Sequence, residues 1–470
     1  MMPPHTLYLP EMLYADGRVH TGVGLLVSPT GVVQGLATKE SAPQATELRL
    51  LGGKALLPGL ANAHSHTFQR LFRGRAEGRA AGGDTFWTWR EQMYRTAAFA
   101  SPEDLYDVAR ATFLEMVCAG ITAVGEFHYL HRDCDGRAYS ESNLLGDQVI
   151  AAAQSVGLRI RLLRSAYFRA GFERPQHPGQ RRFYESPEEY LRNLEDLIAK
   201  HRATENVTVG AAPHSIRAVP LDELRQIAEI ARGRMPLHMH ISEQVGENAA
   251  CEAEYGATPV RLLADNGILS PETTLVHAIH LTVAEYEAVA AAGTTICSCP
   301  TTERNLGDGI FPADIAARLG IPVAFGTDSQ AQIDILEDAR QMEYHLRLRD
   351  QQRGILDASA REDWASRESI EKLLFRSASA NGYAAIGLAG GSLSVGEPAD
   401  FFTVDLNDIS ILGVDAESLA SQAVFSMAKS AVRDVAVQGK LILENGRHRG
   451  AGDIRAKYRG VQERYRQYAR

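Results

Sequence analysis

The feature that most constrains this chain is a unit of helix, glycine and short apolar strand that recurs through its middle. A helix that opens at Ser101-Pro102 and closes at Gly120 shows the pattern, and an apolar run follows it at once. Together with the run 55–57 before His64, the expected strands lie at 121–124, 158–163, 207–212, 235–241, 274–279, 294–299 and 321–325. Strands alternating with helices favour a parallel sheet with crossover helices. The pattern therefore predicts an α/β fold with a TIM-like (β/α)8 barrel.

Both ends of the chain have a different rhythm, in which short apolar runs alternate with turn residues. Residues 6–56 contain turns such as Asp16-Gly17 and Thr30-Gly31, and the pattern returns at 401–404 and 432–443. We therefore expect residues 1–56 and 386–455 to combine into one small β-sandwich domain. The barrel then spans residues 57–385, and residues 456–470 form a C-terminal helix.

Composition and charge exclude several classes of partner. A chain of 470 residues with 45% hydrophobic content can fold as a large barrel with an appended domain. The net charge of -9 and the scattered Lys and Arg residues argue against nucleic-acid binding. No apolar run reaches the ~20 residues that span a bilayer, and the start lacks a signal-peptide pattern, so we expect a cytoplasmic protein without membrane contact. The five cysteines show no Cys-x-x-Cys pair and are expected to be reduced thiols.

Polar residues stand at the carboxyl ends of the predicted barrel strands, where barrel enzymes place their catalytic groups. His64 and His66 follow the first strand at a spacing that points both imidazoles to one side. Later strand ends carry His214, His240 with Glu243 close behind, His277 and Asp328. Each alone could be a satisfied buried polar residue, but their shared placement indicates one site. Imidazoles and carboxylates are ligands for zinc or a similar divalent ion.

Several motifs resemble the amidohydrolase superfamily of metal-dependent hydrolases. They are Pro58-Gly59-Leu60-Ala61-Asn62-Ala63-His64-Ser65-His66, His240-Ile241-Ser242-Glu243, Val276-His277, Gly326-Thr327-Asp328-Ser329 and Gly396-Glu397-Pro398-Ala399-Asp400-Phe401. The resemblance implies a metal site made of His64, His66, His240 and Asp328, with zinc as the expected ion. It also implies a catalytic set of Glu243, His277 and Asp328, and a substrate-binding set of Gln69, Tyr129, His214 and Arg217.

A narrower resemblance concerns the substrate. The His240-to-Glu243 element is typical of the deaminase branch, and Gln69, His214 with Arg217, and segment 299–309 resemble a family of deiminases within it. That family hydrolyses N-formimino-L-glutamate to N-formyl-L-glutamate and ammonia in histidine breakdown. The resemblance thus implies an iminohydrolase that cleaves a C–N bond of a linear amidine and binds a small dicarboxylate. Arg217 suits this role because a guanidinium pairs bidentately with a carboxylate. A homodimer is the expected assembly.

Two other functions use part of the same residue set. A deaminase or chlorohydrolase acting on an aromatic heterocycle such as guanine would share the metal ligands, but Arg217 with Gln69 suits carboxylates better than a flat neutral ring. A non-catalytic metal-binding barrel would need only a closed four-ligand site. Glu243 and His277 are additional to the ligands, which favours an enzyme.

The number of metal ions is predicted from a missing residue. Two-metal members of the superfamily usually bridge their ions with a modified lysine at the end of a middle strand. Between Glu126 and His240 the chain has only Lys200, which belongs to a helix. We therefore expect one divalent ion per chain, with Glu126 as the residue that could substitute for the missing bridge.

Three further assignments involve a choice between neighbours. His240 is preferred to His238, on the same strand face, because of its spacing to Glu243 and its place nearer the strand end. His280 is passed over in favour of His277. Trp87, Trp89 and Arg90 are expected on a long loop, where they either line the site or pack.

Overall fold

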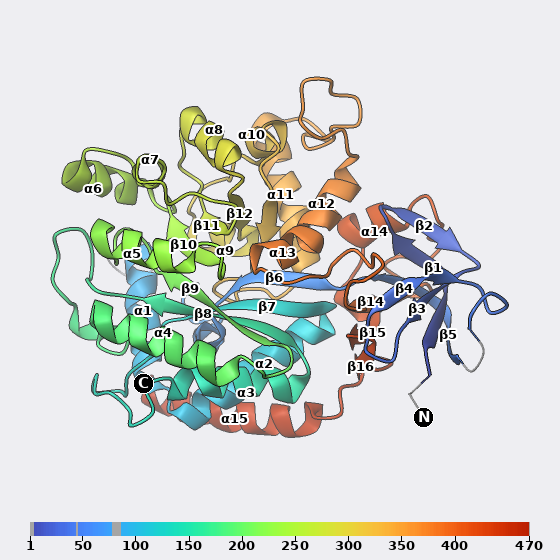
Figure 1. Cartoon of the computed structure of the whole chain (residues 1–470), viewed down its shortest axis with the longest axis horizontal. Helices are drawn as coiled ribbons and strands as arrows, with labels where there is room; N and C mark the ends of the chain where they lie inside the picture. Colours follow the sequence, from blue (N-terminus) through green and yellow to red (C-terminus); the bar gives the residue numbers. More distant parts are fainter. Residues whose placement is uncertain (1–3, 44–45, 78–85, 470) are drawn as a thin grey trace.

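Eight parallel strands neighbour one another in chain order and build the barrel in this computed structural model, which describes residues 4–43, 46–77 and 86–469 and, within these ranges, leaves out the side chains of 86–88. The strands are β6 (Leu60–Ser65), β7 (Ile121–His128), β8 (Arg159–Ala166), β9 (Val207–Pro213), β10 (Leu237–Ile241), β11 (Thr273–His277), β12 (Thr295–Ser298) and β13 (Val323–Phe325). They run through the centre of the larger lobe, with helices around them (Figure 1). The predicted α/β barrel is confirmed.

The barrel closes between its first and last strands. An isolated parallel bridge joins Ser65 to Asp328, and Asp328 N donates to His64 O at 3.0 Å. The buried Asn62 side chain adds two contacts to Thr327, donating to its hydroxyl at 2.7 Å and accepting from its backbone amide at 3.0 Å. The closing seam therefore positions predicted metal-site residues from opposite ends of the sheet.

Helices connect and cover the strands. They are α1 (Phe86–Phe99), α2 (Pro102–Cys118), α3 (Leu144–Val156), α4 (Pro187–His201), α5 (Leu221–Ala231), α6 (Val245–Tyr255), α7 (Pro259–Asp265), α8 (Val283–Ala292), α9 (Pro300–Leu306), α10 (Ala313–Arg318), α11 (Ile335–Asp350), α12 (Ile370–Ala378), α13 (Ala380–Ala385), α14 (Leu419–Phe425) and α15 (Ala451–Tyr468). Helix α2 begins as predicted, because Ser101 Oγ accepts from Asp104 N while the Asp104 carboxylate accepts from Ser101 N. Gly120, at φ 82°, then turns the chain into β7.

Strands from both chain ends form a second, separate sheet beside the barrel (Figure 1). Its members are β1 (Thr6–Ala15), β2 (Arg18–Thr21), β3 (Gly24–Val27), β4 (Val33–Ala37), β5 (Glu47–Pro58), β14 (Phe401–Asp405), β15 (Val432–Val437) and β16 (Lys440–Leu443). β5 pairs with β14 across the two chain ends, and Tyr8 packs edge-on against Phe401 at 4.8 Å. The predicted combination of both chain ends in a sheet beside the barrel is confirmed, whereas the bounds expected for the two domains stay a prediction.

The apolar run before His64 is two strands and not one. We expected residues 55–57 to lead the first barrel strand, but they end β5, which pairs with β14 in the small sheet. The change occurs at Gly59, where a Cβ atom would lie 2.1 Å from Thr122 Oγ1. Leu60 N then donates to Gly120 O, next to β7. One glycine therefore carries the chain directly from the small domain into the barrel.

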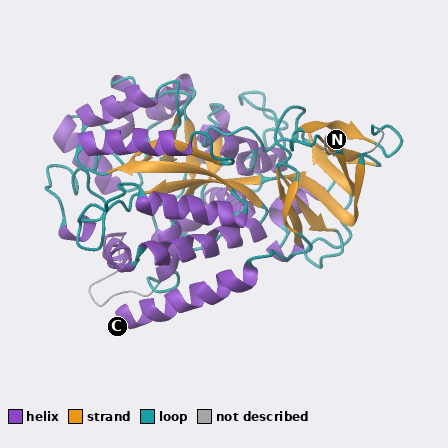
Figure 2. Cartoon of the chain, turned by 60° about the horizontal axis from the view of Figure 1, so that its bottom comes forward, coloured by secondary structure: helices purple, strands orange, loops and turns teal. Residues whose placement is uncertain are grey.

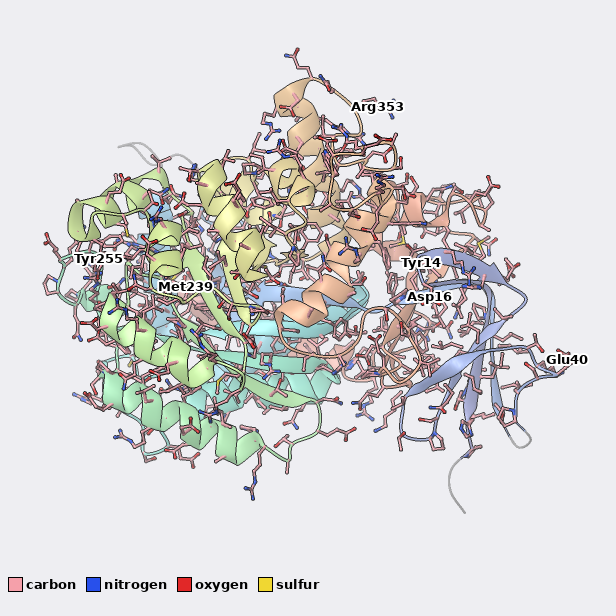
Figure 3. The ribbon with its side chains drawn as sticks, turned by 45° about the horizontal axis from the view of Figure 1, so that its top comes forward. Tyr14, Asp16, Glu40, Met239, Tyr255 and Arg353 are labelled. Carbon is pink, nitrogen blue, oxygen red and sulfur yellow. The ribbon has the colours of Figure 1, made fainter. Side chains whose placement is uncertain are left out.

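The outer helix α15 begins earlier than the predicted residue 456 and runs along the barrel flank (Figure 2). Arg110 Nη1 lies 2.9 Å from Asp453 Oδ2, and Arg464 pairs with Asp104, so α15 is fastened to α2. Figure 3 places Met239 among the barrel strands and Tyr14 where the small sheet approaches the barrel helices. There Tyr14 packs edge-on against Phe375 of α12 at 5.1 Å. Within the described ranges, no helix has both the length and the apolar character needed to cross a membrane.

Candidate active site

Three imidazoles and one carboxylate converge at the carboxyl end of the barrel. His64 and His66 come from the end of β6, His240 from β10 and Asp328 from the turn after β13. The Nε2 atom of His64 lies 3.1 Å from those of both His66 and His240, which are 3.3 Å from each other. Asp328 Oδ1 lies 3.5 Å and 3.3 Å from Nε2 of His64 and His66. The four predicted ligands are thus brought together.

The spacing of these atoms fits a divalent ion of the zinc type. Ligands about 2.0–2.2 Å from a tetrahedral zinc ion lie roughly 3.3–3.6 Å apart, close to the separations in this cluster. The rings are also oriented for binding: His66 Nδ1 lies 2.8 Å from Phe127 O, and His240 Nδ1 lies 3.1 Å from His214 O. These carbonyls accept the Nδ1 protons, which leaves the Nε2 lone pairs for the metal.

Burial keeps the three imidazoles in their metal-binding form. It lowers the pKa of His66 and lowers those of His64 and His240 well below the usual value, where neighbouring imidazoles add to the effect. The rings are therefore neutral near neutral pH, as metal ligation requires.

Two more ionisable groups, Glu243 and His277, lie beside the cluster. His277 Nε2 is 3.8 Å from Glu243 Oε1 and 3.7 Å from Asp328 Oδ2. Burial raises the pKa of Glu243 to about 7, although the His277 charge opposes the rise. Burial alone would lower the pKa of His277, but Glu243, Asp328 and Glu303 outweigh it and raise the pKa well above its usual value. A carboxyl group with a pKa near neutrality can both accept and donate a proton.

Glu303 is a site residue to which the sequence assigned no role. It lies buried in α9, and its Oε1 atom is 3.3 Å from His277 Nδ1 and accepts from Cys299 N at 2.7 Å. Glu303 thereby fixes the His277 ring with Nε2 towards Glu243 and Asp328. Its place within segment 299–309 was a signal, but no spacing rule connects a residue of α9 to the end of β11.

The predicted substrate-binding residues line the same pocket as His66, His240 and Asp328. Gln69 lies in the 3-10 helix Thr67–Phe72 and donates from Nε2 to Tyr129 OH at 2.9 Å. The His214 ring stacks on His240 with centroids 4.7 Å apart. The geometry therefore places Gln69, Tyr129 and His214 on a wall beside the metal ligands.

Arg217 completes this pocket with a buried positive charge. Its Nε and Nη1 atoms are buried and have no hydrogen-bond partner among the described residues. Burial alone would lower its pKa, but Glu247, Tyr167 and Glu243 outweigh that effect and raise the pKa, so the guanidinium stays charged. A buried charge with unused donors is unfavourable unless an anion pairs with it. The pocket is therefore suited to an anionic ligand.

Trp89 and Arg90 also line the pocket, but they do so from helix α1 and not from the expected loop. Met93, Tyr94 and Ala97 are buried at helical spacing, and Trp89 packs 5.6 Å from Phe72. The side chain of Trp87 lies outside the described residues.

The residues that were passed over have other partners. His238 Nε2 lies 2.7 Å from Ala385 O, and His280 Nε2 lies 2.8 Å from Asp308 O. Glu126 accepts hydrogen bonds from Ser65 Oγ at 2.6 Å and from both the backbone amide and the hydroxyl of Thr67 at 2.7 Å. Within the described part of the chain, Glu126 is thus used to hold the β6 end in place.

Comparison with known proteins agrees with this architecture. A formimidoylglutamate deiminase of Pseudomonas aeruginosa is 38% identical over 425 residues, which cover 90% of this chain and 91% of that protein. An 8-oxoguanine deaminase of the same organism is 28% identical over 412 residues, 86% of each chain.

Solved structures show the same fold. The crystal structure of an amidohydrolase from Brucella melitensis matches with a TM-score of 0.88 and 33% identity, covering 98% of this chain and 99% of that one. An adenosine deaminase from Xanthomonas campestris with bound zinc matches with a TM-score of 0.82 and 23% identity over 99% of both chains. The sequence model of the amidohydrolase family matches residues 55–442, most of the chain. This chain therefore belongs to the amidohydrolase family.

Proposed function

We propose that this protein is a hydrolase that deiminates N-formimino-L-glutamate to N-formyl-L-glutamate and ammonia, using one divalent ion, zinc. The observation that carries the proposal is Arg217, whose buried Nε and Nη1 atoms have no hydrogen-bond partner among the described residues, in the same pocket as Glu243, His277 and the ligand cluster. The similarity to a formimidoylglutamate deiminase supports it.

The arrangement supplies each proton transfer that the reaction needs. His64, His66, His240 and Asp328 would hold a divalent ion, which would supply Lewis acidity and make a water more acidic there. Asp328 keeps Oδ2 on the side of His277, where it can accept a proton from the attacking water. Glu243, with its pKa near 7, can donate a first proton to the imino nitrogen, then take the hydroxyl proton of the tetrahedral adduct and deliver it to the same nitrogen, which leaves as ammonia. The proton held by Asp328 then restores protonated Glu243. His277 Nε2 lies between these carboxylates and can hydrogen-bond the attacking oxygen.

The remaining pocket residues select the substrate. A carboxylate that enters a buried pocket without a cationic partner would lose its hydration at a large free-energy cost. Arg217 offers two buried donor atoms, Nε and Nη1, that have no partner within the described ranges, and these can pair with the carboxylate. Gln69, Tyr129 and His214 add uncharged polar groups around the same space. A flat neutral heterocycle would leave the guanidinium unpaired, which favours the dicarboxylate substrate.

A single ion per chain is consistent with the surroundings of the cluster. The Glu126 carboxylate accepts hydrogen bonds from Ser65 Oγ and Thr67 N. Lys200 binds Asp147 outside the cluster, with Nζ 2.8 Å from Oδ2. Neither residue is therefore available to bridge a second tightly bound ion.

Product analysis tests the proposed reaction. Zinc-loaded protein incubated with N-formimino-L-glutamate should release ammonia and N-formyl-L-glutamate in equal amounts. Formamide and glutamate would show that the other C–N bond is cleaved, and the absence of any product would contradict the proposed function.

A further inference from the structure

A second group of metal-ligand atoms lies next to the four-ligand cluster. One nitrogen of His277, the sulfur of Cys299 and one carboxylate oxygen of Asp328 all lie within 4.8 Å of one another, and all three residues are buried. We infer that these residues form a second, weaker metal site for thiophilic divalent ions, and that an ion bound there inhibits the enzyme.

Asp328 can serve both sites because its two oxygens face different neighbours. Oδ1 lies 3.3 Å from His66 Nε2 in the first cluster, whereas Oδ2 lies 3.7 Å from His277 Nε2. The second separation approaches the roughly 3.4 Å expected between two ligands of one tetrahedral ion. Asp328 can thus bridge two ions with one oxygen each.

The surroundings of His277 and Cys299 suit metal binding. Glu303 Oε1 lies 3.3 Å from His277 Nδ1, which is the carboxylate–histidine arrangement that directs the opposite ring nitrogen to a metal. Gly326 makes room for the sulfur, because a Cβ atom there would lie 3.0 Å from Cys299 Sγ and 2.7 Å from His64 Cβ. The absence of a side chain at Gly326 therefore leaves the space between the Cys299 thiol and His64 free.

Binding at this site has a defined chemical balance. The ion forms bonds to nitrogen, oxygen and sulfur. The Cys299 thiol releases its proton to solvent as it becomes a thiolate ligand, and His277 releases its Nε2 proton so that the nitrogen lone pair can bind the ion. Sulfur favours soft ions such as Cd²⁺ and, less strongly, Zn²⁺ over Mg²⁺. Occupancy would tie up His277 and Asp328, which the proposed reaction needs for proton transfer. Only this inhibitory consequence rests on the proposed function.

A stepwise cadmium titration tests the second site without substrate. The reference protein is the Cys134→Ser variant, because Cys134 is the exposed cysteine and would bind cadmium on its own. The first equivalent of Cd²⁺ added to metal-free protein should enter the nitrogen and oxygen cluster without an ultraviolet thiolate-to-cadmium absorption band. Further Cd²⁺ should produce the band, and equilibrium dialysis should then give two ions per chain.

Cys299→Ser in the same background should abolish the band and weaken second-site binding by more than the roughly 10- to 100-fold cost of losing an outer-shell partner. Cys299→Ala is the second variant, and Cys251→Ser, also buried, is the matched control that should retain the band. Retention of the first ion by both Cys299 variants will show that they fold.

Enzyme assays provide an independent readout. Excess Zn²⁺ or Cd²⁺ should inhibit ammonia release by the reference protein, and the Cys299→Ser variant should resist this inhibition. A band that appears with the first equivalent, or a second ion and inhibition unchanged in both Cys299 variants, would overturn the inference. Failure of the proposed function would instead appear as no turnover at one ion per chain, while the absorption and dialysis results would still decide the second site.

Discussion

Glu243 is buried next to the charged His277, and these surroundings lead us to expect that turnover depends on its carboxyl group. Its pKa is raised to about 7, so the carboxyl group can change protonation during a reaction near neutral pH. Glu243→Gln keeps the size and hydrogen bonding but cannot exchange a proton in this range. We expect kcat to fall by about 10²–10⁴-fold, with metal content unchanged by elemental analysis. Glu252→Gln, at an exposed position of α6, is the control. Wild-type turnover in Glu243→Gln would show that Glu243 is structural.

Replacing Arg217 should lower kcat/KM by an amount that depends on whether the substrate carries the contacted carboxylate. Removing one partner of a desolvated charge pair costs roughly 2–5 kcal/mol, so Arg217→Met should lower kcat/KM by about 30- to several thousand-fold. The loss should be much smaller for a formimino compound that lacks the contacted carboxylate. Arg192→Met, on the exposed face of α4, is the matched control. Equal losses on both substrates would show that Arg217 does not hold a carboxylate.

At the scale of elements, a buried polar cluster joins the loop after β7 to β8 and the residues before α4. His131 Nε2 lies 2.8 Å from Ser165 O, and Arg164 binds Glu185 through two hydrogen bonds. Burial, and then the Arg164 charge, lower the pKa of His131 to about 4.

This depressed pKa makes stability depend on pH with a defined sign. Between about pH 6.5 and pH 4 the unfolded chain binds a proton at His131 and the folded chain does not. The contribution of neutral His131 to the free energy of unfolding is therefore fully present above about pH 6.5. It is lost as the pH falls towards 4, by up to about 3 kcal/mol. His131→Gln should show a shallower loss of unfolding free energy in urea titrations over this range. Equal slopes for both proteins would contradict this assignment.

The elements that the sequence predicted well are those whose boundaries are set locally. Ser101 and Asp104 form the cap of α2 within one turn, and Gly120 ends the unit at a conformation that glycine favours. Gly59 was harder to interpret, since its role depends on Thr122 and on β14, both distant in sequence. Periodicity cannot show that an apolar run changes from one sheet to another.

The residues of the candidate site also fall into two groups: those that the sequence pattern indicates, and those that only tertiary packing brings into the site. The ligand and acid-base residues could be proposed because parallel strands bring their carboxyl ends together. Glu303 received no role because its contacts to His277 and Cys299 arise from the packing of α9 against two strands. Residues of helix α1 were expected in a loop. The buried face of this helix is stabilised by tertiary contacts, such as that of Trp89 with Phe72, which the local sequence does not show.

At the scale of the whole molecule, the metal cluster links the two ends of the barrel sheet. His64 belongs to the first barrel strand, His66 directly follows that strand and Asp328 follows the last one, so an ion should stabilise the closed barrel. Removing it leaves Asp328 beside the neutral imidazoles of His64, His66 and His240 without the positive charge of the ion. We expect chelation to lower the thermal midpoint and one equivalent of Zn²⁺ to restore it. At a free-ion concentration of about 1,000 times Kd, binding adds about 4 kcal/mol to the free energy of unfolding.

Elemental analysis after dialysis completes this prediction, with one tightly held ion expected per chain. An unchanged thermal midpoint after verified metal removal would show that the ion does not stabilise the barrel. Two ions that resist dialysis would contradict the single tight site.

The central claim is that the pocket selects a formimino dicarboxylate and not an aromatic ring. Ammonia release by zinc-loaded protein, compared over N-formimino-L-glutamate, N-formimino-L-aspartate, guanine and cytosine, tests this claim most directly. The account predicts the highest kcat/KM for N-formimino-L-glutamate and no measurable turnover of either heterocycle. Turnover of guanine or cytosine with N-formimino-L-glutamate left intact would contradict it.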